Sequence, residues 1–128
     1  MRLLLDTHAL IWFLAADTRL PRKVRAEIEN PETKTLVSAV SAMEVTTKHR
    51  LGKLPQAEAL ALAFEQSIEL HGFEGLPITL RHAEVAGRLP VAHKDPFDRL
   101  LIAQAVLEDL VLVSNEAPFD AFGVARFW

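Results

Sequence analysis

Residues 95–116 read DPFDRLLIAQAVLEDLVLVSNE and carry the clearest signals of secondary structure in the chain. Asp95 is a good N-cap residue and Pro96 suits the first turn of a helix, so the first part of this stretch predicts a helix. The apolar run from Leu110 to Ser114 follows at once and is typical of a short strand covered on both faces. A helix that leads directly into a buried strand indicates a sheet of mostly parallel strands.

The same alternation of strands and helices continues through the rest of the chain. Further strands are expected at residues 2–5, 35–38, 73–78 and 124–127. Further helices are expected at residues 8–16, 21–30, 41–51, 55–71 and 79–89. The sequence shows no internal repeat and no interdomain linker. We therefore predict an α/β fold in which residues 1–128 form a single domain, with a mostly parallel central sheet flanked by helices on both faces.

The composition is that of a globular protein with a sizeable core. Half of the 128 residues are hydrophobic, the formal net charge is −3 and the pI is about 5.9. This charge argues against bulk electrostatic attraction to nucleic acid or to a membrane. The chain has no cysteine, which excludes disulfides and thiolate metal sites and is compatible with a reducing cytoplasm.

The apolar start of the chain has some features of a signal peptide. However, the single basic residue Arg2 precedes the apolar run, and Asp6 and His8 interrupt it. A signal peptide needs a continuous apolar segment, and a helix that spans a bilayer needs about 20 apolar residues. We therefore expect a buried strand followed by a helix in this region.

Four acidic residues are predicted to lie at the ends of these strands and helices: Asp6, Glu44, Asp98 and Glu116. In parallel α/β sheets the ligand site lies beyond the carboxyl ends of the strands, at a topological switch point, so the four acids are expected to meet there. Clustered carboxylates repel one another unless they share a divalent cation. The pattern therefore predicts an enzyme that depends on Mg²⁺ or Mn²⁺.

Each acid also has an ordinary structural explanation. Asp6 can cap the helix that follows it, and Glu44 can complete a capping box with Ser41. Asp98 can favour the positive end of its helix, and Glu116 can be a solvated loop residue. A non-catalytic α/β module that binds a partner or RNA, with structural acidic caps, is therefore the alternative to an enzyme.

Other catalytic motifs are missing from the sequence. The histidines show no HxxxH or HxH spacing, which argues against a zinc site, and His93 is expected on the surface. There is no GxGxxG or Walker-type loop and no GxSxG motif. The first strand ends in Asp6-Thr7-His8 and not in D-x-D, which argues against a phosphatase of the haloacid dehalogenase type.

Four segments, two of which overlap the stretch quoted first, are distributed over nearly the whole chain. In order they are LLLDTHALIWFL (3–14), VSAVSAMEVTTKHRLGKL (37–54), HKDPFDRLLIAQA (93–105) and LVSNEAPFDAFGV (112–124). These segments resemble the PIN-domain family, and more closely the VapC-type toxins of bacterial toxin–antitoxin pairs. The third segment followed by LVSNE is the most specific part of this resemblance.

The resemblance implies a metal-dependent endoribonuclease that hydrolyses RNA phosphodiester bonds. Asp6, Glu44 and Asp98 match the family's first three acids, which hold Mg²⁺ or Mn²⁺. Glu116 matches the fourth acid, with contact to the metal through water, and Ser114 matches a small hydroxyl residue that accompanies it. A cytoplasmic toxin, a homodimer and a cognate antitoxin protein are also implied, with no membrane association.

An acidic pocket repels RNA, so cationic side chains elsewhere are needed to hold the strand. The candidates for this role are Lys48, Arg50, Lys53 and Arg99. A second basic cluster consists of Arg19, Arg22, Lys23 and Arg25. This second cluster is explained slightly better as a solvated helix face.

The antitoxin of such a pair typically lays an apolar segment in a groove of the toxin and a basic side chain among the acids. Candidates for lining the groove are Trp12, Phe13 and Leu14. Packing of these residues in the core is the alternative explanation.

Overall fold

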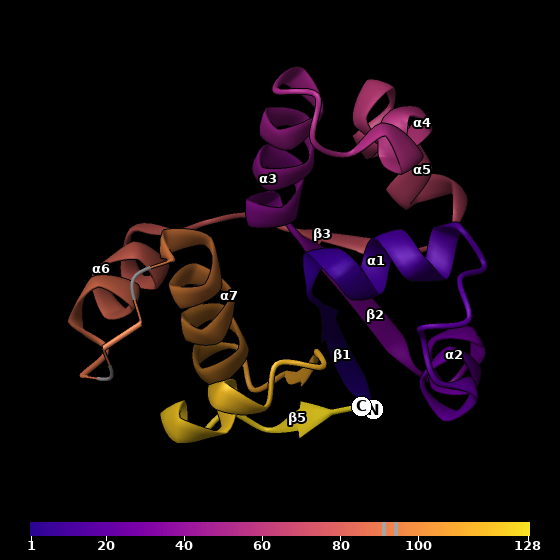
Figure 1. Ribbon diagram of the computed structural model, residues 1–128. Helices are drawn as coiled ribbons and strands as arrows, with labels where there is room; N and C mark the ends of the chain where they lie inside the picture. Colours follow the sequence, from indigo (N-terminus) through magenta and orange to yellow (C-terminus); the bar gives the residue numbers. More distant parts are fainter. Residues whose placement is uncertain (91, 94) are drawn as a thin grey trace.

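The computed structural model describes residues 1–90, 92–93 and 95–128 (Figure 1). These residues form a five-stranded sheet in which every strand pair is parallel, with the order β3-β2-β1-β4-β5. The strands are β1 (Arg2–Leu5), β2 (Lys34–Ser38), β3 (Glu74–Leu76), β4 (Val111–Val113) and β5 (Arg126–Phe127). The predicted α/β class with a mostly parallel sheet is confirmed.

Helices connect the strands and cover both faces of the sheet (Figure 1). The α-helices are α1 (Thr7–Leu14), α2 (Arg22–Glu29), α3 (Ala39–Arg50), α4 (Glu58–Leu62), α5 (Phe64–Leu70), α6 (Leu80–Arg88) and α7 (Pro96–Leu107). Two short 3₁₀ segments are η1 (Pro55–Ala57) and η2 (Ala117–Phe122). None of the helices in the described part of the chain has the length and hydrophobicity needed to cross a membrane.

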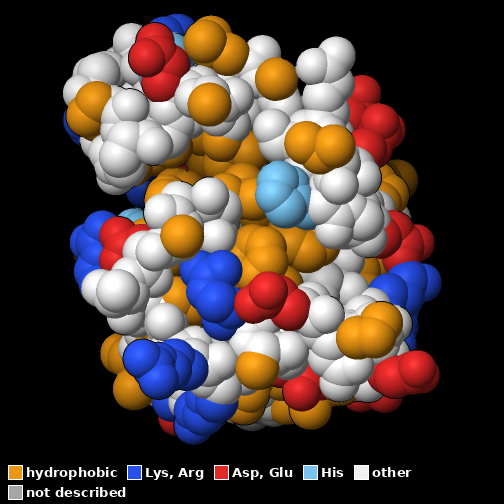
Figure 2. Space-filling model, turned by 90° about the vertical axis from the view of Figure 1, so that its right-hand side faces the viewer, with side chains coloured by type: hydrophobic (Ala, Val, Ile, Leu, Met, Phe, Trp, Pro, Cys, Tyr) orange, Lys and Arg blue, Asp and Glu red, His pale blue; other side chains and the backbone are white. Residues whose placement is uncertain are grey.

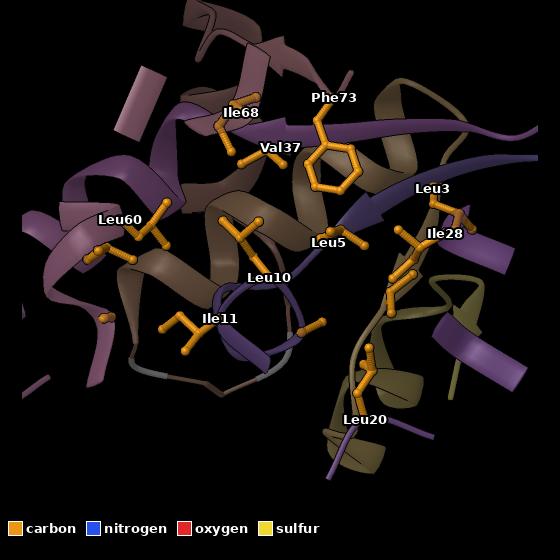
Figure 3. Close-up of a cluster of buried hydrophobic side chains, with 14 of the residues drawn as sticks. Leu3, Leu5, Leu10, Ile11, Leu20, Ile28, Val37, Leu60, Ile68 and Phe73 are labelled. Atoms are coloured by element: carbon orange, nitrogen blue, oxygen red, sulfur yellow. The ribbon is translucent and has the colours of Figure 1, made fainter. Parts of the chain in front are cut away.

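The sheet separates two hydrophobic clusters, because successive side chains of a strand point to opposite faces. Leu3 and Leu5 of β1 belong to the first cluster, where they join residues of α1, α2, α4 and α5 (Figure 3). Leu4 belongs to the second cluster, which includes Leu101 and Ile102 of α7. The central strands are therefore buried on both faces, as their continuous apolar runs predict.

The strand order places a topological switch point between β1 and β4. The connections from β1 run through β2 to β3 on one side, whereas β4 and β5 lie on the other side. The segments that leave β1 and β4 therefore diverge at the carboxyl edge of the sheet, where α/β proteins bind their ligands.

The predicted starts of α1 and α7 are confirmed, whereas that of α3 is wrong. The carboxylates of Asp6 and Asp95 accept hydrogen bonds from the first turns of α1 and α7. By contrast, the N-cap of α3 is Ser38 and not the expected Ser41, because the hydroxyl of Ser38 accepts from the N–H of Val40. Glu44 is therefore in the second turn of α3 and takes no part in a capping box.

The long helix predicted at residues 55–71 is divided into η1, α4 and α5. The division between α4 and α5 falls at Ala63, which has φ −148° and ψ 52° and lies outside the helical region. On either side of it, Leu60 and Ile68 are buried in the first cluster (Figure 3). Two short helices bring both side chains into the core.

Candidate active site

The four predicted acids line one pocket at the carboxyl edge of the sheet. The pocket has a volume of about 130 Å³ and lies between the start of α1, α3 and α7. Its lining residues are Asp6, Thr7, His8, Glu44, Lys48, Asp95, Asp98, Leu101 and Glu116. The sheet topology thus brings together side chains that are up to 110 residues apart in the sequence (116 − 6).

Asp6 is the most buried acid of the pocket, with 6% of its surface exposed. It follows β1 directly, and its backbone N–H donates to the carbonyl of Val113 in the neighbouring strand at 3.0 Å. Its carboxylate accepts from the N–H of Ala9 at 2.8 Å. Burial raises the pKa of Asp6 to about 6, although hydrogen bonds from Ser114 and Ala9 act in the opposite direction.

Glu44 is 7% exposed and projects from α3 toward the start of α1. Its carboxylate accepts from the hydroxyl of Thr7 at 2.6 Å and pairs with the Nζ atom of Lys48 at 2.5 Å. The hydroxyl of Ser41 lies 3.0 Å from that of Thr7, whose only proton points to Glu44. Ser41 is therefore the donor in this second contact, and the three residues form a buried chain of hydrogen bonds.

Asp98 lies in the first turn of α7, where its carboxylate is 2.8 Å from Nε2 of His93. Partial burial raises the pKa of Asp98, with further contributions from the negative charges of Asp95 and Glu44. The hydrogen bond from His93 acts in the opposite direction. Asp98 in turn raises the pKa of Asp6 by repulsion, so the acids influence one another across the pocket.

Glu116 is exposed at the rim of the pocket. Its backbone N–H donates to the hydroxyl of Ser114, which is fully buried just beyond β4. Ser114 also forms a hydrogen bond with Asp6. Ser114 thus holds Asp6, and Glu116 lines the exposed side of the pocket; the metal role of Glu116 stays a prediction.

The donor set suits a hard divalent cation, because Mg²⁺ and Mn²⁺ prefer carboxylate oxygens and retain several waters. The raised pKa of the buried Asp6 indicates that its negative charge lacks a sufficient counter-charge. Among the described residues, however, no three acidic or histidine side chains converge closely enough to hold a metal ion as they stand. Glu44 and Asp98 instead contact Lys48 and His93.

Two partners of the acids were not anticipated from the sequence. The sequence assigned Thr7 no role at the site and His93 was expected on the surface, but each contacts a carboxylate of the pocket. The spacing holds a weak signal for both: Thr7 follows Asp6 directly, and His93 precedes Asp98 by five residues. Without the turn geometry, such spacing does not specify a contact.

The predicted RNA-binding cations have different surroundings. Arg50 and Lys53 are exposed near the end of α3, and Lys48 is paired with Glu44. Arg99 donates to the carbonyls of four residues that follow or end α6, namely Ala86, Gly87, Leu89 and His93. Arg99 therefore has a structural role, and its part in RNA binding stays a prediction.

We expect Arg99→Met to lower the free energy of unfolding by about 2–4 kcal/mol, because several carbonyls lose a charged donor. Urea denaturation of the two proteins measures this difference. Arg88→Met is the matched control, since the Arg88 side chain is 77% exposed and its one ion pair among the described residues is with Glu84 on the surface of α6. A loss of less than about 0.5 kcal/mol in both variants would show that the contacts of Arg99 contribute little.

Several solved proteins have a similar fold. VapBC2 from Rickettsia felis, bound to a DNA fragment from its promoter, matches with a TM-score of 0.70 at 15% identity, over 100% of this chain and 99% of that chain. FitAcB from Neisseria gonorrhoeae matches with a TM-score of 0.69 at 22% identity, over 98% and 96% of the two chains. A toxin–antitoxin complex from Klebsiella pneumoniae gives 0.61 at 21% identity, over 91% and 92%. At these identities the likeness is one of fold.

A search of curated proteins found no matching sequence. The family model of the PIN domain, in contrast, matches residues 3–124. This match takes in all four acids of the pocket. The chain therefore belongs to the PIN-domain family.

Proposed function

We propose that the protein is a Mg²⁺- or Mn²⁺-dependent endoribonuclease and the toxin of a toxin–antitoxin pair. The observation that carries the proposal is the convergence of Asp6, Glu44, Asp98 and Glu116 on one pocket, with Asp6 buried at an elevated pKa. Such an arrangement is costly for a merely structural purpose, because buried like charges destabilise the fold. A cluster of carboxylates is useful, however, where the protein must bind a cation.

In this proposal Asp6, Glu44 and Asp98 hold the metal, and Glu116 reaches it through water. A divalent cation, when bound, supplies activation of the attacking water and stabilisation of the negative charge that develops on the phosphate. The chain contributes the placement of the carboxylates: the hydroxyl of Thr7 orients Glu44, and that of Ser114 orients Asp6. Outer contacts of this kind tune metal sites as strongly as some ligands do.

The RNA would be held by cations outside the acidic pocket. Arg50 and Lys53 support this part of the proposal, since both are exposed at the end of the helix that carries Glu44. Lys48 lies at the pocket itself and would contact phosphate once a metal neutralises Glu44. Binding through such contacts should weaken steeply with salt.

A partner protein is part of the same proposal. Solved relatives include a toxin–antitoxin complex, and hydrophobic side chains gather in a hollow on the face of α1, α2, α4 and α5 (Figure 2). Two pockets of about 220 and 420 Å³ on this face share His71 and include Leu14 and Phe13, respectively. An apolar antitoxin segment would fit there. A homodimer and a cytoplasmic location are proposed with it, on the family resemblance.

The second candidate is a non-catalytic binding module with structural acids. It is favoured by one observation: Asp6 caps α1, while Glu44 and Asp98 each contact a basic side chain. The two candidates differ in what the pocket does with a metal. An enzyme site should bind Mn²⁺, whereas caps and ion pairs should not.

The test is incubation of the purified protein with a mixed RNA pool in Mg²⁺ or Mn²⁺, beside the same reactions in EDTA. We expect cleavage that requires the metal, together with Mn²⁺ binding in a calorimeter. Absence of both would favour the binding module. Mn²⁺ binding without cleavage would indicate a narrow RNA target that the pool lacks.

A further inference from the structure

A buried glutamine joins the two helices that carry acids of the pocket. Gln104 lies on α7, six residues after Asp98 (104 − 98), and none of its surface is exposed. A buried side-chain amide is retained at a cost unless its donors and acceptor are all paired. The contacts of Gln104 therefore indicate what this residue does.

The first contact reaches the helix of Glu44. Oε1 of Gln104 accepts from the hydroxyl of Ser38 at 2.5 Å, and the same hydroxyl accepts from the N–H of Val40 at 2.9 Å. Since Ser38 is the N-cap of α3, one hydroxyl group both starts this helix and connects it to the middle of α7. Both partners are buried, so water does not compete for the bond.

The second contact reaches the segment between β3 and α6. Nε2 of Gln104 donates to the carbonyl of Pro77 at 3.2 Å and lies 3.4 Å from Nδ1 of His82. The amide thus connects three segments: the start of α3, α7, and the connection that follows the edge strand. Because the donor and acceptor sides of the amide face different segments, the geometry fixes its orientation.

His82 continues the network without reaching α3. The N–H of Thr79 donates to Nδ1 of His82, so the ring proton is on Nε2, which donates to Glu108 at 2.8 Å. Glu108 is the C-cap of α7, at the end of the helix opposite to Asp98. This part of the network stabilises the packing of α6 on α7 and makes no contact with the helix of Glu44.

We infer that Gln104 is a positioning residue that fixes α3 relative to α7, and thereby the spacing of Glu44 and Asp98, through its bond with Ser38. The helix positioning stands on the hydrogen bonds alone, whereas its consequence for metal binding rests on the proposed function. Gln104→Met keeps the length of the side chain and removes its polar atoms. It should broaden the distance between α3 and α7 and weaken Mn²⁺ binding about tenfold, the lower end of the range for residues that contact a metal ligand directly.

The experiment measures the helix spacing directly, without relying on a metal. The chain has no cysteine, so spin labels can be placed on introduced cysteines at Thr46 of α3 and Val106 of α7, both exposed. Pulsed electron resonance then gives the distance between the labels, with the labelled protein diluted in unlabelled protein so that only distances within one chain count. Calorimetry gives the Mn²⁺ affinity of the same variants.

Two further variants distinguish the positioning of α3 relative to α7 from a general loss of packing around α7. Ser38→Ala removes the same bond from the other side, together with the cap of α3, and reports on the bond if Gln104→Met does not fold. Glu108→Ala removes the bond to His82, and so disturbs α6 and α7 without touching α3. We expect a broadened label distance and weaker Mn²⁺ binding in the first two variants, and neither effect in Glu108→Ala.

Unchanged label distances in Gln104→Met and Ser38→Ala would overturn the inference, as would equal broadening in Glu108→Ala. If the wild-type protein binds no Mn²⁺ but the label distance still broadens in Gln104→Met, the positioning role stands and the proposed ribonuclease fails. The label distances therefore test the inference, and Mn²⁺ binding by the wild-type protein tests the proposed function.

Discussion

Asparagine in place of Asp98 is expected to lower metal-dependent RNA cleavage at least a hundredfold while the fold remains intact. Loss of an outer partner of a metal ligand costs about 10–100-fold, and loss of a ligand itself should cost at least the upper end of that range. The side-chain oxygen of asparagine still accepts from His93, so the turn before α7 keeps its contact. Because burial and the charges of Asp95 and Glu44 raise the pKa of Asp98, removing its charge should not lower the stability of the metal-free protein at neutral pH.

The matched control is Asp109→Asn, which makes the same chemical change just beyond the opposite end of α7. Asp109 is exposed and has φ +54°, a conformation that asparagine tolerates well. Cleavage and Mn²⁺ affinity should match the wild type in this variant. Cleavage that survives Asp98→Asn would point to a contaminating nuclease or to a site elsewhere on the protein.

The central strands and α7 could be predicted because their signals are local. β1 is a run of leucines closed by Asp6, and α7 begins with Asp95 and Pro96, which specify a helix start without help from distant residues. The alternation of such elements implies a parallel sheet, and a parallel sheet implies that the acids collect at its carboxyl edge. That the acids share one pocket therefore follows from short segments and a general rule.

The start of α3 could not be predicted because a distant residue determines it. Ser38 and Ser41 are both plausible caps in the sequence, and Glu44 follows Ser41 at capping-box distance. In the fold, Ser38 is selected by its bond with Gln104, 66 residues away, while Ser41 faces Thr7. Local propensity allows either serine as the N-cap of α3, and tertiary contacts determine that Ser38 is the one used.

The contacts of the site residues could not be predicted either, because they too depend on tertiary packing. His93 lies before α7 and Arg99 near the start of α7, where the local sequence is compatible with a solvated surface. They nevertheless contact Asp98 and the end of α6, respectively. The side chain of Lys48 forms an ordinary i,i+4 pair with Glu44, which the sequence allows, but its place at the pocket depends on the packing of α3. The sequence thus predicts which acids form the candidate site, but only the fold shows which side chains contact them.

Asp6→Asn is expected to make the metal-free protein more stable at neutral pH. Burial raises the pKa of Asp6 from its ordinary value of 3.8 to about 6, so the folded state binds a proton more tightly than the unfolded state does. Stability due to this group is therefore present at low pH and is lost as the pH rises from about 4 to 6. Above that range the charged carboxylate costs the fold up to about 3 kcal/mol, since one pKa unit corresponds to 1.36 kcal/mol.

Asparagine removes this cost and keeps the cap, because its side-chain oxygen can still accept from the N–H of Ala9. In urea denaturation with EDTA, the variant and the wild type should be similar near pH 4. At pH 7.5 the variant should be more stable by about 1–3 kcal/mol. Asp17→Asn is a control of opposite sign: Arg19 holds the pKa of Asp17 at about 2, so this substitution should not stabilise the protein at neutral pH.

Saturating Mn²⁺ should reverse the order of stability. A ligand that binds only the folded state at a thousand times its Kd contributes about 4.1 kcal/mol, which exceeds the expected gap, and we expect this gain in the wild type but not in Asp6→Asn. Equal stabilisation of both proteins by Mn²⁺ would show that the metal binds away from Asp6. If instead the variant is no more stable than the wild type at pH 7.5 in EDTA, the Asp6 carboxylate carries no desolvation cost. If the expected results are found, the charge of Asp6 both weakens the metal-free fold and holds the metal, which is the compromise expected of a buried cation site.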